Sequence, residues 1–296
     1  MLFERNIENL DEDRKALIGL WRAQRAPNWT FDPRPAGRSG RWARFRRLAV
    51  VVLASGCGLL EAASAQTDEI QVYDAEINNP GQFSVQLHNN YTPIGRKKPD
   101  FPGGIVPEHA LNGVPEWAYG VNDWLELGLY LPLYSVTRDG RFLLNGAKLR
   151  TLFVSPHAQD RTFFYGINFE LSFNAHHWEK TRYSGEIRPI IGVHLGPVDL
   201  IGNPILDTSF NGVRQLDFAP CERIAYNFSK TWAAAVEHYE DYGPVSGFEP
   251  VKREEQTLFG VIDYKGDPNS VEFGIGHGFT AASDSLVIKL MVTHNF

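Results

Sequence analysis

The sequence predicts an all-β fold, a transmembrane antiparallel up-and-down β-barrel of about 12 strands that is preceded by a signal peptide. Apolar and polar residues alternate in short runs from Gly81 to Phe296, and a period of two is the pattern of strands. The connections between these runs are alternately short and long. There is no run of about eighteen apolar residues, which a transmembrane helix would need.

The first part of the chain is predicted to be a leader. Five arginines between Arg38 and Arg47 precede the apolar run Leu48–Leu60, and Ala63-Ser64-Ala65 supplies the small residues that a signal peptidase reads. We therefore expect a Sec-type signal peptide over residues 41–65 and a mature chain that begins at Gln66. Residues 1–40 are too long and too acidic for an n-region. We expect them to be an over-extended or disordered N-terminus.

The two cysteines leave one question open. Leu53-Ala54-Ser55-Gly56-Cys57 partly matches a lipobox, although Ala54 stands where leucine is usual, so lipidation of Cys57 stays an alternative to cleavage after Ala65. After that cleavage only Cys221 remains. An exported chain with one cysteine has no internal disulfide, so its stability must come from its strands.

The charge of the mature chain excludes one class of partner. The leader contains 11 of the 29 Lys and Arg and 7 of the 35 Asp and Glu, so the mature chain has a net charge of −10. A protein that binds nucleic acid usually presents a basic surface. We therefore expect no nucleic-acid partner.

Twelve strands are predicted after a polar lead-in. Residues 66–80 show no period and are expected in the periplasm, and residues 81–296 form the barrel. The predicted strands cover residues 83–88, 117–121, 125–131, 147–153, 163–173, 187–193, 198–206, 224–228, 232–237, 258–264, 271–276 and 285–296.

The fifth of these strands has the clearest pattern. Its apolar side chains occupy every second position from Phe163 to Phe173, and Asn168, Glu170 and Ser172 lie on the opposite face. Tilted in a barrel, a strand of this length spans the hydrocarbon layer. A soluble sandwich strand is typically about half as long, so this segment favours a membrane barrel.

The lengths of the connections support the same architecture. The short ones are Asn122-Asp123, Ser155 to Asp160, Gly196-Pro197, Ser229-Lys230 and Lys265 to Asn269. The mostly longer ones are Thr92 to Gly113, Ser135 to Asn145, Asn174 to Arg182, Asp207 to Arg214 and Asp241 to Glu254. Outer-membrane barrels have short periplasmic turns and longer outer loops.

The last twelve residues resemble the closing strand of bacterial outer-membrane barrels. Leu286, Ile288, Leu290 and Val292 form an apolar face opposite a mostly polar one, and the chain ends on Phe296. The resemblance implies that Phe296 is the signal that the outer-membrane assembly machinery recognises. His294 departs from the pattern, because an apolar residue is usual at that position.

Two longer segments also resemble a known group. Pro115–Tyr130 and Arg223–Tyr239 each contain a strand, a two-residue turn, an aromatic residue and another strand. They are similar to the units of uncharacterised proteobacterial porin-like barrels, including the phenol-degradation outer-membrane type. The resemblance covers about Gly81 to Phe296. It implies a channel and no catalytic residue.

Ten charged residues are predicted on the inner face of the strands. In a soluble sandwich this face would be solvated, whereas in a barrel it lines the lumen. The lumen-lining candidates are Glu126, Lys148, Arg150, Glu170, Glu186, Arg188, Arg223, Glu237, Glu272 and Lys289. Five are acidic and five are basic, so we expect ion pairs or a wetted pore with a net charge near zero.

Other chemistry has weaker support. His277 lies near Ser283 and Ser285, but no serine motif of a lipid-cleaving barrel enzyme is present. His176 and His177 could bind a metal, although adjacent residues of an extended segment point in opposite directions. We therefore predict no catalytic, cofactor-binding or metal-binding residue.

The sequence as a whole predicts a narrow channel or porin-like protein of the bacterial outer membrane that passes small solutes and is not an enzyme. Its expected partners are outer-membrane lipid, the assembly machinery and small solutes. A barrel enzyme acting on lipid, or a plugged barrel with a structural or surface-binding role, stays an alternative.

Overall fold

The computed structural model describes residues 69–296. The predictions for residues 1–40, for the signal peptide, for Cys57 and for a mature N-terminus at Gln66 lie outside the described residues. No helix among residues 69–296 is long and apolar enough to cross a membrane.

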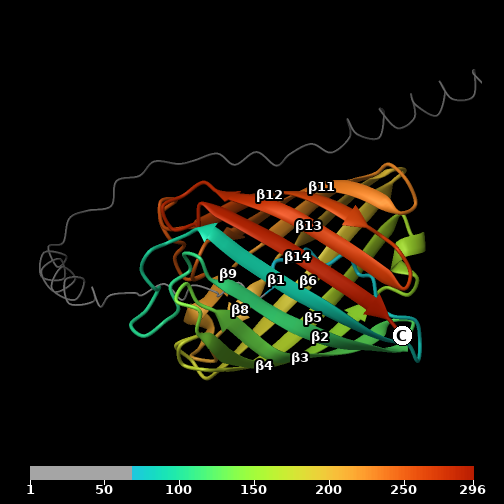
Figure 1. Ribbon diagram of the computed structural model, residues 1–296. Helices are drawn as coiled ribbons and strands as arrows, with labels where there is room; N and C mark the ends of the chain where they lie inside the picture. Colours follow the sequence, from blue (N-terminus) through green and yellow to red (C-terminus); the bar gives the residue numbers. More distant parts are fainter. Residues whose placement is uncertain (1–68) are drawn as a thin grey trace, which may run out of the picture. The chain divides into compact units, whose positions relative to one another are not determined.

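The described chain forms a closed antiparallel barrel whose wall has twelve strands, as the sequence predicts (Figure 1). The wall strands are β1 (Phe83–Ile94), β2 (Leu111–Asn122), β3 (Leu125–Val136), β4 (Phe142–Val154), β5 (Phe163–Asn174), β6 (Tyr183–Leu195), β7 (Val198–Asn203), β10 (Cys221–Asn227), β11 (Trp232–Asp241), β12 (Glu255–Tyr264), β13 (Asn269–Gly278) and β14 (Leu286–Asn295). The first and last strands pair from Ser84 with Asn295 to Ile94 with Leu286. This closure removes free sheet edges, as lipid requires.

The connection between β7 and β10 contains the remaining short elements. These are β8 (Leu206–Thr208), the 3-10 helix η2 (Val213–Gln215) and β9 (Leu216–Phe218). Another 3-10 turn, η1 (Ala158–Asp160), lies between β4 and β5. The predicted strand 198–206 is therefore interrupted. β6 pairs first with β7 and then with β8, because Pro204 separates the two.

The prediction of a loop from Ser135 to Asn145 is wrong. β3 continues to Val136 and β4 begins at Phe142, so only residues 137–141 connect them. The polar residues that indicated a loop lie inside the barrel, where Ser135 Oγ donates to Asn112 Oδ1 at 2.6 Å and Asn145 Nδ2 donates to Ser135 Oγ at 2.7 Å. A polar strand residue is stable there because its hydrogen bonds are satisfied.

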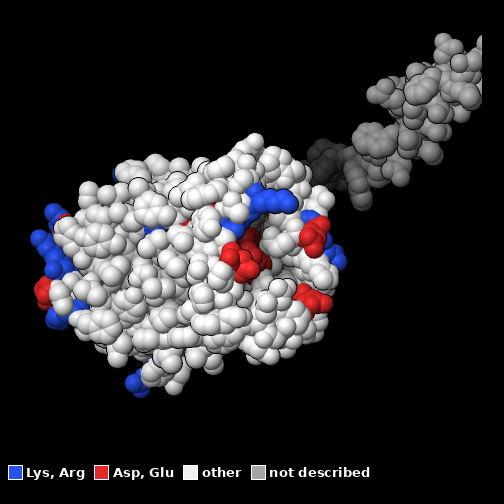
Figure 2. All heavy atoms as spheres, turned by 45° about the vertical axis from the view of Figure 1, so that its right-hand side comes forward, with Lys and Arg blue, Asp and Glu red and all other residues white. Residues whose placement is uncertain are grey.

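The two faces of the strands are as predicted. On β5, Phe169 is 41% exposed, whereas Asn168 and Glu170 are buried. On β14, Leu290 points outward and Lys289 is buried. The outer wall shows almost no charged atoms in Figure 2, and the charged groups gather toward the two ends. The barrel therefore has an apolar exterior suited to lipid.

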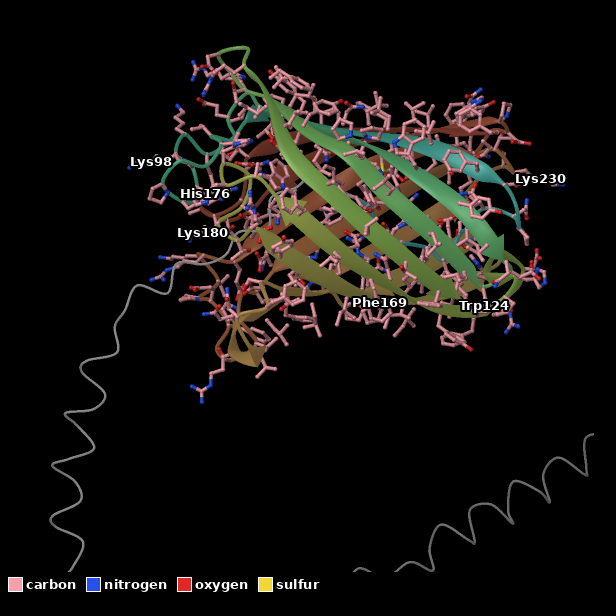
Figure 3. The ribbon with its side chains drawn as sticks, turned by 90° about the horizontal axis from the view of Figure 1, so that it is seen from below. Lys98, Trp124, Phe169, His176, Lys180 and Lys230 are labelled. Carbon is pink, nitrogen blue, oxygen red and sulfur yellow. The ribbon has the colours of Figure 1, made fainter. Side chains whose placement is uncertain are left out.

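Aromatic side chains cluster at the end of the barrel that has the short turns. Trp124, in the turn between β2 and β3, stacks on Phe153, and Trp232 packs on Tyr264. Figure 3 shows Trp124 and Lys230 at this end, His176 at the opposite end and Phe169 between them. Such a girdle is typical of a membrane interface.

The segment from Glu69 to Pro80, which was expected in the periplasm, packs against the inner wall. Ile70, Val72, Tyr73 and Ala75 are each at most 5% exposed. The backbone of Tyr73 is held by the side chain of Asn203, which accepts from its N–H at 2.7 Å and donates to its carbonyl at 3.0 Å. The barrel interior is therefore partly filled by the chain that precedes β1.

Candidate functional site: the charged interior of the barrel

The ten charged residues singled out in the sequence all have side chains that are at most 18% exposed. Each forms an ion pair with another of the ten. The pairs are Lys148–Glu170, Arg150–Glu126, Arg188–Glu186, Arg223–Glu237, Arg223–Glu272, Lys289–Glu237 and Lys289–Glu272. The alternation of the strands therefore brings these residues together as ion pairs. We call the three pairs on β3 to β6, with the groups around them, the first network, and the four linked residues on β10 to β14 the second network.

The first network lies on β1 to β6, and Arg150 contacts two of its carboxylates. Arg150 on β4 contacts Glu126 on β3 and lies 2.8 Å from Glu116 on β2. Glu116 also lies 3.2 Å from Nε2 of His88 on β1. Farther around the wall, Lys148 lies 3.4 Å from Glu170.

The second network lies on β10 to β14. Arg223 contacts Glu237 on β11 and Asp263 on β12, and it lies 3.4 Å from Glu272 on β13. Lys289 contacts the same Glu237 and lies 2.5 Å from Glu272. Two basic side chains thus share two carboxylates. This sharing offsets part of the cost of removing charges from water.

Glycines opposite two of the basic residues make room for these networks. Gly128 pairs with Arg150, and a Cβ there would lie 2.6 Å from Arg150 Nε. Gly274 pairs with Lys289, and a Cβ there would lie 2.8 Å from Lys289 Cε. The long side chains can therefore lie flat across the neighbouring strand.

Three interior acids were missed in the sequence. Glu116 pairs with Arg150, Asp263 pairs with Arg223, and Glu69 lies 3.8 Å from Arg188. The periodicity could have found two of them, because Glu116 precedes the outward Trp117 and Asp263 precedes the outward Tyr264. Since the networks gain no further Lys or Arg among residues 69–296, their formal charge is negative rather than near zero.

Residues 69–80 contact both networks and so join them. The hydroxyl of Tyr73 lies 2.7 Å from the Tyr130 hydroxyl, and its ring centre lies 4.3 Å from the Arg188 guanidinium. Arg188 donates to the carbonyl of Gln71 at 3.1 Å, and Lys289 donates to the carbonyl of Ile70 at 3.2 Å. Nothing in the sequence of residues 69–80 indicated these contacts.

The candidate enzyme residues do not form a dyad. Nδ1 of His277 lies 2.9 Å from the backbone carbonyl of Ser285, while the Ser283 hydroxyl bonds to the backbone of Gln256. Among the described residues, none of the serine hydroxyls near His277 is hydrogen-bonded to its ring. His277 and the serines near it are therefore not arranged as the base and nucleophile of acyl transfer.

His176 and His177 do not converge on a common ligand position. The ring of His176 contacts Phe101 with centroids 6.2 Å apart, whereas Nε2 of His177 lies 3.2 Å from Asn145 Oδ1. Burial lowers the pKa of His177. Each ring therefore has its own neighbours in the structure.

The outer loops line a pocket. Its volume is about 560 Å³, and it lies between the loops 95–110, 137–141 and 175–182. Ile105, Val106 and Leu143 supply apolar surface, and Arg138 and Arg141 supply charge. The end of the barrel with the long loops is therefore hollowed on one side.

Comparisons with known proteins agree with the fold. The sequence matches no protein-family model and no curated protein. An outer membrane channel from Pseudomonas putida F1 is 13% identical with a TM-score of 0.53, and the match covers 77% of this chain and 100% of that one. The KdgM porin in complex with disordered oligogalacturonate is 10% identical over 72% of this chain and 99% of that one, with a TM-score of 0.46. The NanC porin is 7% identical over 72% and 98%, also with a TM-score of 0.46. At these identities the likeness shows the fold, and the closed barrel of this chain is similar to that of the Pseudomonas channel.

Proposed function

We propose that this protein is an outer-membrane channel that passes small solutes through a narrow path. The observation that supports this most is the contrast between the two faces of the wall. The outside is apolar, while ten predicted and three further charged residues lie inside. A protein that only needed a stable barrel could fill its interior with apolar side chains at lower cost.

The interior also offers places for water. The side-chain oxygens Asn168 Oδ1 and Asp263 Oδ1 are buried and have no hydrogen-bond partner among the described residues. Buried polar atoms of this kind are normally satisfied by ordered water. A hydrated interior supports passage of polar solutes or ions.

The path is narrow for two reasons. Twelve strands enclose less space than the sixteen or more of open porins. Residues 69–80 also occupy part of the interior, with Tyr73 held between Tyr130 and Arg188. We therefore expect a small conductance. A barrel that these residues close permanently is the alternative, with a structural or surface-binding role.

The charge of the interior sets the ion preference. Ions are selected by the charges that line a pore, and the interior acids outnumber the Lys and Arg residues of the two networks by three. We expect a cation preference that weakens as salt rises, because counterions screen each charge within about 10 Å at 0.1 M salt. Catalysis is not part of the proposal: the His277 ring bonds to the backbone carbonyl of Ser285, and the Ser283 hydroxyl bonds to the backbone of Gln256.

The experiment is single-channel recording of the purified protein in a planar bilayer under a salt gradient. We expect small conductance steps and a reversal potential of cation-selective sign. Glu116→Gln should reduce that preference, and Asp160→Asn, an exposed change in the turn between β4 and β5, should not. Strong anion selectivity would overturn the proposal. An absence of current over many insertions would favour the plugged barrel or an enzyme.

A further inference from the structure

Three side chains of types that can bind a metal lie together on the outer face of β10 and β11. Glu222 is the cross-strand partner of His238, and Glu240 follows two residues later on the face of His238. Nδ1 of His238 lies 2.9 Å from Glu222 Oε1 and 3.8 Å from Glu240 Oε1. The ligand atoms of the three residues all lie within 4.8 Å of one another.

The cluster stands at the edge of the apolar band. Ile224 and Val236 point outward on the same face and are 58% and 49% exposed. Beyond the cluster, toward the long loops, the rings of Phe218, Tyr242 and Phe248 pack on one another with centroids 5.5 to 6.1 Å apart. Aromatic groups beside an apolar band mark the membrane interface, so the cluster lies at that depth.

The two carboxylates lack the basic partners that the interior acids have. Among residues 69–296, Glu222 and Glu240 form ion pairs with His238 alone, and neither contacts Lys or Arg. Their side chains are 50% and 16% exposed. Two carboxylates that lie this close to each other beside an apolar surface repel each other, and a cation bound between them would offset that repulsion.

One further contact orients the cluster. The hydroxyl of Tyr242 donates to Oε2 of Glu240 at 2.6 Å, which leaves Oε1 on the side of His238. Hydrogen bonds of this kind fix carboxylates that bind metals. The strand pairing holds the backbones of Glu222 and His238, so two ligands come from a rigid part of the wall.

We propose that Glu222, His238 and Glu240 form a site for a divalent cation of the Zn²⁺ type. One imidazole nitrogen and two carboxylate oxygens suit such a borderline cation better than Ca²⁺ or Mg²⁺, which prefer oxygen ligands alone. The cation is bound between His238 Nδ1 and the carboxylate oxygens of Glu222 and Glu240. Three protein ligands leave an open coordination position, which faces the membrane surface. The site joins the outer ends of β10 and β11 and is independent of the channel interior.

The test is a titration of the purified, untagged protein with Zn²⁺ after removal of metals by a chelator. We expect one saturable site per chain, reversed by chelator, and Co²⁺ should give visible absorption bands on binding. His238→Gln and Glu240→Gln should each lower Zn²⁺ affinity by about 10-fold or more. His277→Gln is the matched control, because His277 is an outward histidine near the same end of the barrel that bonds to the carbonyl of Ser285 rather than to a carboxylate.

The variants must first show the same heat-modifiable migration on gels as the unaltered protein, which establishes that the barrel is intact. Equal Zn²⁺ binding by His238→Gln and the unaltered protein would overturn the proposal. So would Ca²⁺ binding of the same strength that does not depend on His238, since the imidazole would then have no role. Loss of Zn²⁺ binding in His277→Gln would also place the site elsewhere.

Discussion

The ammonium group of Lys289 on β14 contacts the carboxylate of Glu237 on β11 although β12 and β13 lie between these strands in the wall. Both side chains are fully buried. Lys289 also donates to the carbonyl of Ile70. Lys289, on the closing strand, therefore links β11 to residues 69–80, which precede β1.

Lys289→Met should destabilise the barrel by about 3–5 kcal/mol, because it leaves a buried carboxylate without one of its partners. Unfolding by urea in detergent or lipid vesicles measures the change. Lys230→Met, in the exposed turn between β10 and β11, is the matched control and should have almost no effect (Figure 3). Equal midpoints for the two variants would show that the second network does not stabilise the fold.

Phe169→Arg should destabilise the assembled barrel by about 2–4 kcal/mol if the site lies near the bilayer midplane, because the substitution places a charge on the lipid face. Glu170→Gln, one residue later, should fold normally and change conduction, since Glu170 faces Lys148 inside the barrel. Folding yield in lipid vesicles and single-channel current separate the two effects. Similar behaviour of both variants would contradict the assignment of Phe169 to the lipid face and of Glu170 to the barrel interior.

Tyr73→Ala should raise the single-channel conductance. The change removes the contact with the Tyr130 hydroxyl and the ring that lies against Arg188. Both losses weaken the hold of the wall on residues 69–80. Tyr226→Ala, an exposed aromatic on β10, is the control and should leave conductance unchanged. An unaltered current in Tyr73→Ala would mean that residues 69–80 do not limit the path.

The outer loops should loosen as pH rises. Burial and the nearby Asp241 raise the pKa of Asp217 to about 7, above its ordinary value of 3.8. A carboxyl with a raised pKa favours the packed state below about pH 4, and that contribution is lost as pH rises through about 7. Asp217 lies where the loops 204–220 and 242–254 meet, beside Pro244.

Limited trypsin cleavage after the exposed Arg214 measures this change. Cleavage should be faster at pH 8 than at pH 5 after correction for trypsin activity on a peptide. Asp217→Asn should remove most of the difference, whereas Asp160→Asn should retain it. Identical profiles for Asp217→Asn and the unaltered protein would contradict this assignment.

Deletion of Phe296 should leave the chain unassembled and protease-sensitive in the periplasm. The backbone N–H of Phe296 donates to the carbonyl of Phe83 at 2.9 Å, so the last residue joins the two ends of the barrel. Phe296 is 68% exposed, so it is accessible to the assembly machinery that we expect to recognise it. Heat-modifiable migration on a gel measures assembly, and normal migration of the truncated chain would contradict the role of the terminal residue.

The sequence by itself determined the class of the fold and the direction of most side chains. Alternation is a local property of a strand, so Phe169 and Glu170 could be assigned to opposite faces from their spacing alone. The same period placed Arg150, Arg223 and Lys289 on one side of their strands. Loop boundaries were less certain where polar residues such as Ser135 and Asn145 bond inside the barrel.

Only the tertiary structure decided which of these residues meet. The contact between Lys289 and Glu237 depends on the curvature of a closed wall, which no local spacing encodes. The position of Tyr73 depends on groups from several strands, because its own segment has no period. The cluster of Glu222, His238 and Glu240 depends on the register of β10 against β11. Local periodicity fixes which face a side chain takes, whereas register and closure fix its neighbours.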